Sequence, residues 1–211
     1  MYQKIKRLLD FIIAIILLIV FAIPMLLVAL AIKFDDGGSI LYKQKRMGKS
    51  LKPFYIYKFR TMKSNREELK SELTHDKMVT RVGRVLRATS IDELPQLINI
   101  LKGDMSFIGP RPWMIEYYRL FSDEQKKRCD VIPGLSGLAQ VKGRNGIDIF
   151  QKINYDIEYV NSASLWLDTK LFILSIITVV KKSNSEISEL GIKDELKKLK
   201  EIQNKAEVIH R

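Results

Sequence analysis

The chain has 211 residues and a formal net charge of +12, with 36 Lys and Arg against 24 Asp and Glu. Its single cysteine, Cys129, excludes an intramolecular disulfide, and two histidines with one cysteine are too few for a His/Cys zinc site. The positive charge favours nucleic acid, anionic membrane lipids or a phosphate-bearing substrate as a partner. Because the sequence has no zinc-finger spacing and no RNA-binding aromatic signature, we expect no nucleic-acid partner.

The first predicted element is an apolar run at 11–32, which is long enough to cross a bilayer. Basic residues flank it on both sides, and eight Lys and Arg against two Asp occur between residues 33 and 60. The positive-inside rule disfavours translocation of either flank, and Pro24 favours a kink. The pattern therefore predicts a re-entrant helix that returns to the same face and leaves the rest of the chain in the cytoplasm. A single-pass anchor and a cleaved signal peptide are the alternatives.

A β-hairpin is predicted after the apolar run. Residues 40–45 and 54–60 have the composition of strands, and the loop between them is longer than a tight turn. In the second strand, Lys58 and Arg60 are two positions apart, so we expect both side chains on one face. Residues 64–74 form a polar, helix-favouring stretch that we expect to be exposed.

Helices and an irregular loop are predicted in the second half of the chain. Residues 91–102 have apolar side chains at helical spacing, and Gly103 is a plausible stop. Four of the eleven glycines fall within 134–146, which predicts an ordered but irregular loop region. The segment 165–180 is apolar but carries two charges, and its uninterrupted part, 171–180, is too short to span. We expect a helix packed on the body or lying in the membrane interface.

These elements predict one helix-rich α/β (α+β) domain with a small β-hairpin. We expect a membrane anchor at 1–34, a cytoplasmic body at 35–182 and a charged helical tail at 183–211. The tail has one apolar stripe, which fits a solvated helix or a self-association helix, so a homodimer is an open alternative.

The pair Asp92 and Glu93 is the central candidate for chemistry, because it begins an amphipathic helix just after a basic run. A helix N-terminus favours phosphate and lowers carboxylate pKa values, so Asp92 could act as a nucleophile or help to hold Mg²⁺ beside a diphosphate. Helix capping is the alternative, since Ser90 to Glu93 matches the S-x-x-E capping box. Pro95 would then fall in the first hydrogen-bonded turn, which disfavours Ser90 as the cap. Both interpretations stay open on the residues alone.

Two further segments have the features of phosphate-binding loops. In the segment 109–112, Pro110 and Pro112 restrict the backbone around Arg111, and a pre-set Arg is a good bidentate phosphate ligand. The segment 133–145 is rich in glycine and ends in basic residues, which suits close backbone approach to a nucleotide or phosphate. It lacks the spacing of a P-loop. A rigid turn and a plain surface loop are the respective alternatives.

Together these segments resemble the bacterial sugar transferase family, specifically the small monotopic phosphoglycosyl transferases. The matching stretches are Lys-Arg-Met-Gly (45–48), Tyr-Lys-Phe-Arg-Thr-Met (57–62), Thr-Ser-Ile-Asp-Glu-Leu-Pro-Gln-Leu (89–97), Leu-Lys-Gly-Asp-Met-Ser-Phe-Ile-Gly-Pro-Arg-Pro (101–112) and Pro-Gly-Leu-Ser-Gly-Leu-Ala-Gln-Val-Lys-Gly-Arg-Asn (133–145). The resemblance covers about residues 1–182. A basic membrane-surface scaffold that binds anionic lipid is the main non-enzymatic alternative, and it leaves Asp-Glu-Leu-Pro and Gly-Pro-Arg-Pro unexplained.

The resemblance implies that a UDP-sugar donates its phosphosugar to undecaprenyl phosphate, which gives undecaprenyl diphosphosugar and UMP. It implies that Asp92 attacks the phosphate and forms a covalent aspartyl-phosphosugar, and that Glu93 completes the dyad. Mg²⁺, with Asp92 as a ligand, would screen the diphosphate. The residues implied to contact the donor or its phosphates are Lys58, Arg60, Arg87, Arg111 and Arg144.

The resemblance also implies a location and a pathway. The enzyme would be monotopic in the bacterial inner membrane, with its catalytic domain on the cytoplasmic face, and would carry out the first membrane step of glycoconjugate assembly. One residue departs from the family pattern, because members usually have Ser-Pro at the re-entrant bend and this chain has Ile23 before Pro24. A Ser hydroxyl can satisfy a carbonyl that proline frees, and Ile23 cannot.

Overall fold

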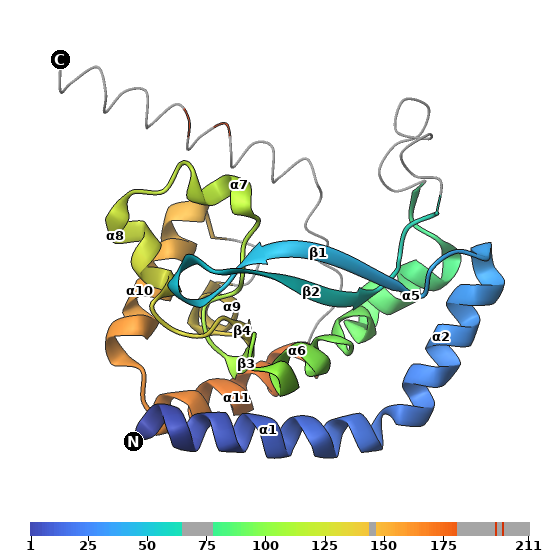
Figure 1. Ribbon diagram of the computed structural model, residues 1–211, viewed down its shortest axis with the longest axis horizontal. Coiled ribbons are helices and arrows are strands. Elements are labelled where there is room, and N and C mark those ends of the chain that lie inside the picture. The colour runs from blue at the N-terminus through green and yellow to red at the C-terminus, as the bar shows by residue number, and fades with distance from the viewer. Residues whose placement is uncertain (65–77, 144–146, 181–196, 198–199, 201–211) are drawn as a thin grey trace.

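The computed structural model describes residues 1–64, 78–143 and 147–180, together with 197 and 200. The predicted polar stretch at 64–74 and the charged tail therefore lie almost entirely outside the described residues. The described part of the chain is rich in helix, as the sequence predicts, and has two small sheets, of which the sequence predicts only the hairpin (Figure 1).

The N-terminal apolar run forms two helices, α1 (Tyr2–Val20) and α2 (Ala22–Asp36), which meet at an angle of 61°. Pro24 is the third residue of α2, where it has no N–H to donate to the Val20 carbonyl, so the break falls just before it. Within the described residues, no single helix is long and apolar enough to cross a membrane. The bent pair meets that test only jointly, by length and composition.

The predicted hairpin is confirmed. Strands β1 (Leu41–Met47) and β2 (Pro53–Phe59) pair antiparallel, and the loop between them contains the short 3₁₀ turn η1 (Lys49–Leu51). Residues directly opposite each other in the ladder share a face of the sheet. One face therefore carries the pairs Tyr42–Lys58, Gln44–Ile56 and Arg46–Phe54.

The prediction of one continuous helix over 91–102 is wrong. Helix α5 (Arg81–Thr89) ends at Ser90, which has a positive φ of 59°, and the 3₁₀ turn η2 (Ile91–Glu93) follows. Helix α6 (Gln96–Lys102) begins after Pro95 and ends at Gly103, whose φ of 87° confirms the predicted stop. Pro95 cannot donate the hydrogen bond that a continuous helix requires, so the chain makes two short pieces.

The second half of the chain packs around a short parallel pair, β3 (Ser106–Ile108) and β4 (Gly134–Ser136). The remaining elements are α7 (Ile115–Tyr118), α8 (Asp123–Lys126), η3 (Lys127–Cys129), α9 (Leu138–Gly143), α10 (Ile149–Ser162) and α11 (Leu165–Val180). The irregular loop expected at 134–146 is thus a strand and a helix over its described part. The helix predicted at 165–180 is confirmed.

Helix α6 lies between α1 on one side and the hairpin on the other (Figure 1). Its residues Leu97 and Ile100 are fully buried, with Ile56 of β2 and Ala14 of α1 in the same apolar cluster. Asn99 on α6 binds the backbone of β2. Its side-chain nitrogen donates to the Tyr55 carbonyl, and its side-chain oxygen accepts from the Tyr57 N–H. The position of the hairpin relative to η2 is therefore fixed through α6.

Polar contacts also tie α1 to this core. Arg7 donates to the carbonyls of Ile100 and Leu101 in the last turn of α6, where a cation is favourable. Asp10 is buried and accepts from the N–H of Phe107 on β3, with an N···O distance of 3.2 Å. The N-terminal helix is thus part of the packed body.

Candidate active site

The sequence pair Asp92–Glu93 lies in η2, the tight turn between α5 and α6. The Ser90 side chain forms no capping hydrogen bond there, and Glu93 turns its carboxylate to other partners. The capping-box alternative is therefore not what the structure contains. The tight turn holds the two carboxylates beside the face of the hairpin that carries Lys58.

Two cations hold Glu93 in place. The Lys58 ammonium donates to Glu93 Oε1 at 2.7 Å, and the Arg111 guanidinium donates to both carboxylate oxygens. Burial acts to raise the pKa of Glu93, but the charges of Arg111 and Lys58 outweigh it and hold that pKa well below its usual range. In return, the Glu93 carboxylate raises the pKa of Arg111. Glu93 is therefore a permanently ionised group that positions two cations.

Asp92 has a different environment from its neighbour. Its side chain is 13 % exposed, and its Oδ2 lies 3.8 Å from the Lys58 ammonium, beyond hydrogen-bonding distance. Burial raises the pKa of Asp92 above its usual value, although the charge of Lys58 opposes this. The carboxylate thus remains available to a reacting group, and a carboxylate of raised pKa is the better nucleophile.

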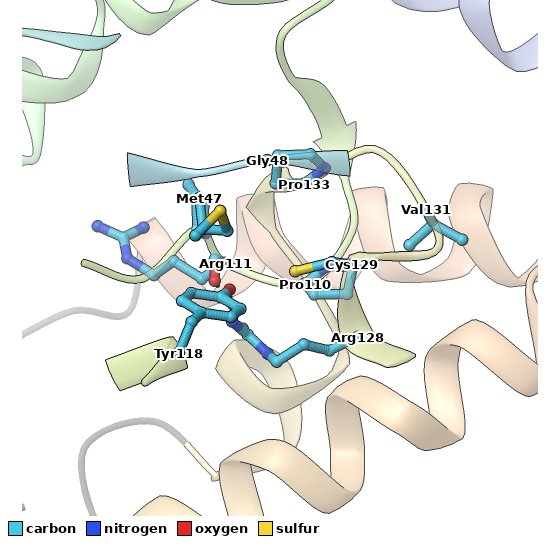
Figure 2. A pocket seen from close by; sticks show the side chains of 10 residues that line it. Met47, Gly48, Pro110, Arg111, Tyr118, Arg128, Cys129, Val131 and Pro133 are labelled. Carbon is cyan, nitrogen blue, oxygen red and sulfur yellow. Dashed lines mark hydrogen bonds between the residues drawn. The ribbon is translucent and has the colours of Figure 1, made fainter. Parts of the chain in front are cut away.

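Arg111 is held by its backbone as well as its side chain. Its guanidinium donates to the Leu135 carbonyl at 3.2 Å, and its own carbonyl accepts from the Arg128 guanidinium at 2.7 Å. Figure 2 shows Arg128 and Tyr118 beside the Arg111 backbone at a small pocket, with the Arg111 guanidinium pointing away from the pocket. The proline-flanked segment therefore aims Arg111 at Glu93.

Arg128 is itself fully enclosed. It is 2 % exposed, donates to Asp156 on α10 and to the Tyr118 hydroxyl, and lies over the Trp113 ring at 4.4 Å. Sequence reasoning missed Arg128 and Asp156, because Arg128 ends a run of charged residues that nothing in the sequence distinguishes from its surface neighbours. The Arg128–Asp156 pair joins η3 and α10 to the segment that carries Arg111.

Glycines allow the two candidate loops to lie against each other. A Cβ on Gly109 would come within 2.5 Å of the Ile132 carbonyl, and one on Gly134 within 2.1 Å of the Gly109 nitrogen. Only glycine fits such an approach of backbone to backbone. The two segments singled out in the sequence thus meet beside β3 and β4.

The other predicted site residues have varied places. Arg87 donates to the Thr61 hydroxyl at 3.0 Å, and its charge acts on Asp92. Arg60 follows the end of β2 and forms an ion pair with Asp36, so the structure does not bring it to the carboxylate pair. Lys58 and Arg60 have different partners, and the expectation that their side chains share a face stays a prediction. Arg144 lies outside the described residues.

No group of three or more His, Cys, Asp or Glu that could hold a metal occurs in the part of the chain that the structure describes. Both Glu93 oxygens have cationic partners, whereas Asp92 has a carboxylate to offer. Mg²⁺ commonly uses one or two carboxylates with substrate phosphates and water. The donor set therefore fits an ion held by Asp92 together with a phosphorylated substrate.

Comparison with known proteins identifies the family. Residues 1–182 match the model of the family described as bacterial sugar transferase. The chain belongs to this family. It is 41 % identical over 175 residues to the uncharacterized sugar transferase EpsL of Bacillus subtilis, covering 83 % of this chain and 87 % of that one.

Two further relatives carry more specific names. The UDP-glucose:undecaprenyl-phosphate glucose-1-phosphate transferase of Caulobacter vibrioides is 42 % identical over 190 residues, covering 85 % of this chain and 71 % of that one. The UDP-N-acetylgalactosamine-undecaprenyl-phosphate N-acetylgalactosaminephosphotransferase of Aeromonas hydrophila is 41 % identical over 187 residues, covering 85 % of this chain but 44 % of that one. The match thus extends over most of the Bacillus subtilis and Caulobacter vibrioides proteins and less than half of the Aeromonas hydrophila protein.

Proposed function

We propose that this sugar transferase moves a phosphosugar from a UDP-sugar to undecaprenyl phosphate, which gives undecaprenyl diphosphosugar and UMP. The names of the relatives in Caulobacter vibrioides and Aeromonas hydrophila support the donor class and the acceptor. The observation that carries the proposal is the difference between two neighbouring carboxylates. Glu93 is fixed by two cations, Lys58 and Arg111, whereas the Asp92 carboxylate beside them remains available.

The proposed reaction has two displacement steps at one phosphorus. A carboxylate oxygen of Asp92 attacks the phosphorus that bears the sugar, and the bond from that phosphorus to the bridging oxygen breaks. UMP leaves with the electron pair and the bridging oxygen. An oxygen of the polyprenyl phosphate then attacks the same phosphorus and displaces Asp92, which regains its carboxylate.

The cations of the site lower the barrier to both steps. Lys58 and Arg111 are held by Glu93, so they meet the charge that develops on the phosphates without having to reorganise. Asp92 and the substrate phosphates would hold Mg²⁺, which would further neutralise the charge of the diphosphate. Activity should therefore stop in EDTA and return with added Mg²⁺, and full activity in EDTA would contradict the metal assignment.

We propose a monotopic attachment for the anchor at 1–34, with the body at 35–182 on the cytoplasmic face of the bacterial inner membrane. The bend between α1 and α2 supports this, as does the number of exposed apolar side chains on α1, α2 and α11. These side chains include Leu8, Ile12, Ile16, Ile19, Ile23, Leu26, Leu27, Phe34, Trp166 and Ile173. So large an apolar surface is unfavourable in water and favourable against lipid. The homodimer through the tail at 183–211 stays a prediction.

The experiment that tests the proposed function is UMP release across a panel of UDP-sugars with undecaprenyl phosphate and Mg²⁺. The wild type should turn over at least one donor, and Asp92→Asn should lose activity by at least about 10³-fold, because an amide is not a competent nucleophile. The control is Asp123→Asn, which changes the exposed Asp-Glu pair on α8 and should keep wild-type activity. Near-normal turnover by Asp92→Asn would favour a different mechanism, and no turnover of any donor by the wild type would favour a scaffold.

A further inference from the structure

Arg46 lies on the same face of the hairpin as Lys58. Arg46 is opposite Phe54 in the ladder and Lys58 is opposite Tyr42, so the two cations are four residues apart along the sheet, or about 13 Å. The residue between them on β1, Gln44, accepts a hydrogen bond from the Arg46 guanidinium at 2.5 Å. The neighbour Lys45 is exposed and points to the other face. The hairpin therefore carries Arg46 and Lys58 on one face and Lys45 on the other.

Arg46 is half-buried and has no anionic partner among the described residues. Its Nε atom is enclosed and has no hydrogen-bond acceptor in the described structure, and no carboxylate forms an ion pair with it there. The charge of Glu116 on α7 acts on Arg46, but that carboxylate is exposed. Burial and the positive charge of Arg111 lower the pKa of Arg46 to about 10. A partly buried cation beside a second cation is unfavourable unless an anion joins them.

The position of Arg46 relative to α1 favours the soluble substrate over the lipid. Helix α6 separates the hairpin from α1, and β1 packs instead against α7 (Figure 1). A lipid acceptor reaches the site from the apolar surface of α1, α2 and α11, whereas β1 and α7 lie on the other side of α6. The diphosphate of a nucleotide sugar has two charged groups, of which Asp92 attacks one.

We propose that Arg46, together with Arg111, binds the phosphate that leaves with the nucleotide of the donor. This inference rests on the proposed function and adds a binding residue to it. Lys58, positioned by Glu93, then binds the phosphate that Asp92 attacks, and Arg46 binds the phosphate of the departing UMP. The planar guanidinium of arginine matches the geometry of phosphate oxygens.

The test is Arg46→Gln, with Lys45→Gln as the matched control that removes one charge from the next position of the same strand. In Arg46→Gln, the KM for the UDP-sugar and the inhibition constant of UMP should both rise by about tenfold or more, because a charge-assisted contact is lost. The KM for undecaprenyl phosphate should not change. Lys45→Gln should match the wild type in all three values.

Stability and direct binding separate this role from a structural one. Removing a half-buried cation that has no anionic partner should leave the Tm of the apo protein equal or raise it, whereas loss of a structural arginine would lower it. Equilibrium binding of UMP, measured without turnover, should weaken in Arg46→Gln and remain partial in Arg46→Lys. Unchanged UMP binding, or a higher KM for the acceptor alone, would overturn the inference while the wild type still releases UMP. A wild type that turns over no donor would instead overturn the proposed function.

Discussion

At the scale of the residue, Asp92 and Glu93 differ in environment although they are neighbours in one tight turn. Glu93 is fixed by Lys58 and Arg111 and stays ionised, whereas Asp92 is partly buried with a raised pKa, and the Lys58 ammonium 3.8 Å away is not hydrogen-bonded to it. Two carboxylates whose pKa values are pushed apart take different roles in one reaction. These contacts support the proposed roles of Asp92 as nucleophile and Glu93 as a positioning group.

The pH dependence of kcat should report the pKa of Asp92. The ionised form is the nucleophile, so activity is lost as the pH falls through that pKa. Lys58 opposes the effect of burial, so Lys58→Met should raise the pKa of Asp92 further and move the acid limb of the profile to higher pH. Lys52→Met, in the exposed hairpin loop, should leave the limb in place. A limb that stays fixed or moves to lower pH in Lys58→Met would contradict this origin.

At the scale of the element, the sequence predicted what local patterns determine. The hairpin at 41–59, the long helix α11 and the stop at Gly103 follow from strand composition, apolar spacing and a glycine in the left-handed region. The helix over 91–102 was a wrong prediction, because periodicity continued across Pro95 while the backbone could not. That break places Asp92 and Glu93 in a tight turn instead of a helix N-terminus.

The contacts around Arg111 could not be predicted from the sequence. Arg128 and Asp156 are 28 residues apart and meet only because α10 packs against η3. The same holds for Arg46, whose significance comes from burial beside Arg111 and not from its neighbours in the chain. Arg60 shows the reverse case, because a basic residue near the motif has a structural partner in Asp36.

The Arg128–Asp156 pair should contribute strongly to stability. Asp156→Asn would leave Arg128 buried without its counter-charge, so the free energy of unfolding should fall by about 3 kcal/mol. On the same helix, Glu158 forms an exposed ion pair with Lys142, and Glu158→Gln should change that free energy by less than about 1 kcal/mol. Denaturant unfolding of both variants measures the difference. Equal effects would mean that the enclosed pair has no special role in holding the Arg111 segment.

At the scale of the whole molecule, the apolar helices and the catalytic turn are joined through α6. Helix α1 contacts α6 on one side, and α6 contacts β2 on the other, so a membrane-bound anchor would place the carboxylate pair at a fixed position relative to the lipid surface. This arrangement suits an acceptor with its phosphate at the interface and a donor in the cytoplasm. It requires that both ends of the anchor lie on one side of the membrane.

Thiol labelling tests that topology. In a Cys129→Ser background, Gln3→Cys and Ser39→Cys should both resist an impermeant thiol reagent in intact cells and label once the inner membrane is opened. Labelling at position 3 in intact cells would mean that the segment spans the membrane. Pro24→Ala should restore a hydrogen bond to Val20 and shift part of the population toward a straight, spanning helix. An unchanged labelling pattern in Pro24→Ala would mean that the basic flanks alone hold the bend.

The measurement that tests the central claim most directly is the intact mass of the enzyme after incubation with a turned-over UDP-sugar and Mg²⁺ in the absence of acceptor. Covalent catalysis predicts a gain of one phosphosugar, located on the peptide that contains Asp92 and released by undecaprenyl phosphate. Asp123→Asn should gain the same mass, and Asp92→Asn should gain none. An unmodified wild type, together with kinetics that require both substrates bound at once, would contradict Asp92 as the nucleophile and favour direct transfer.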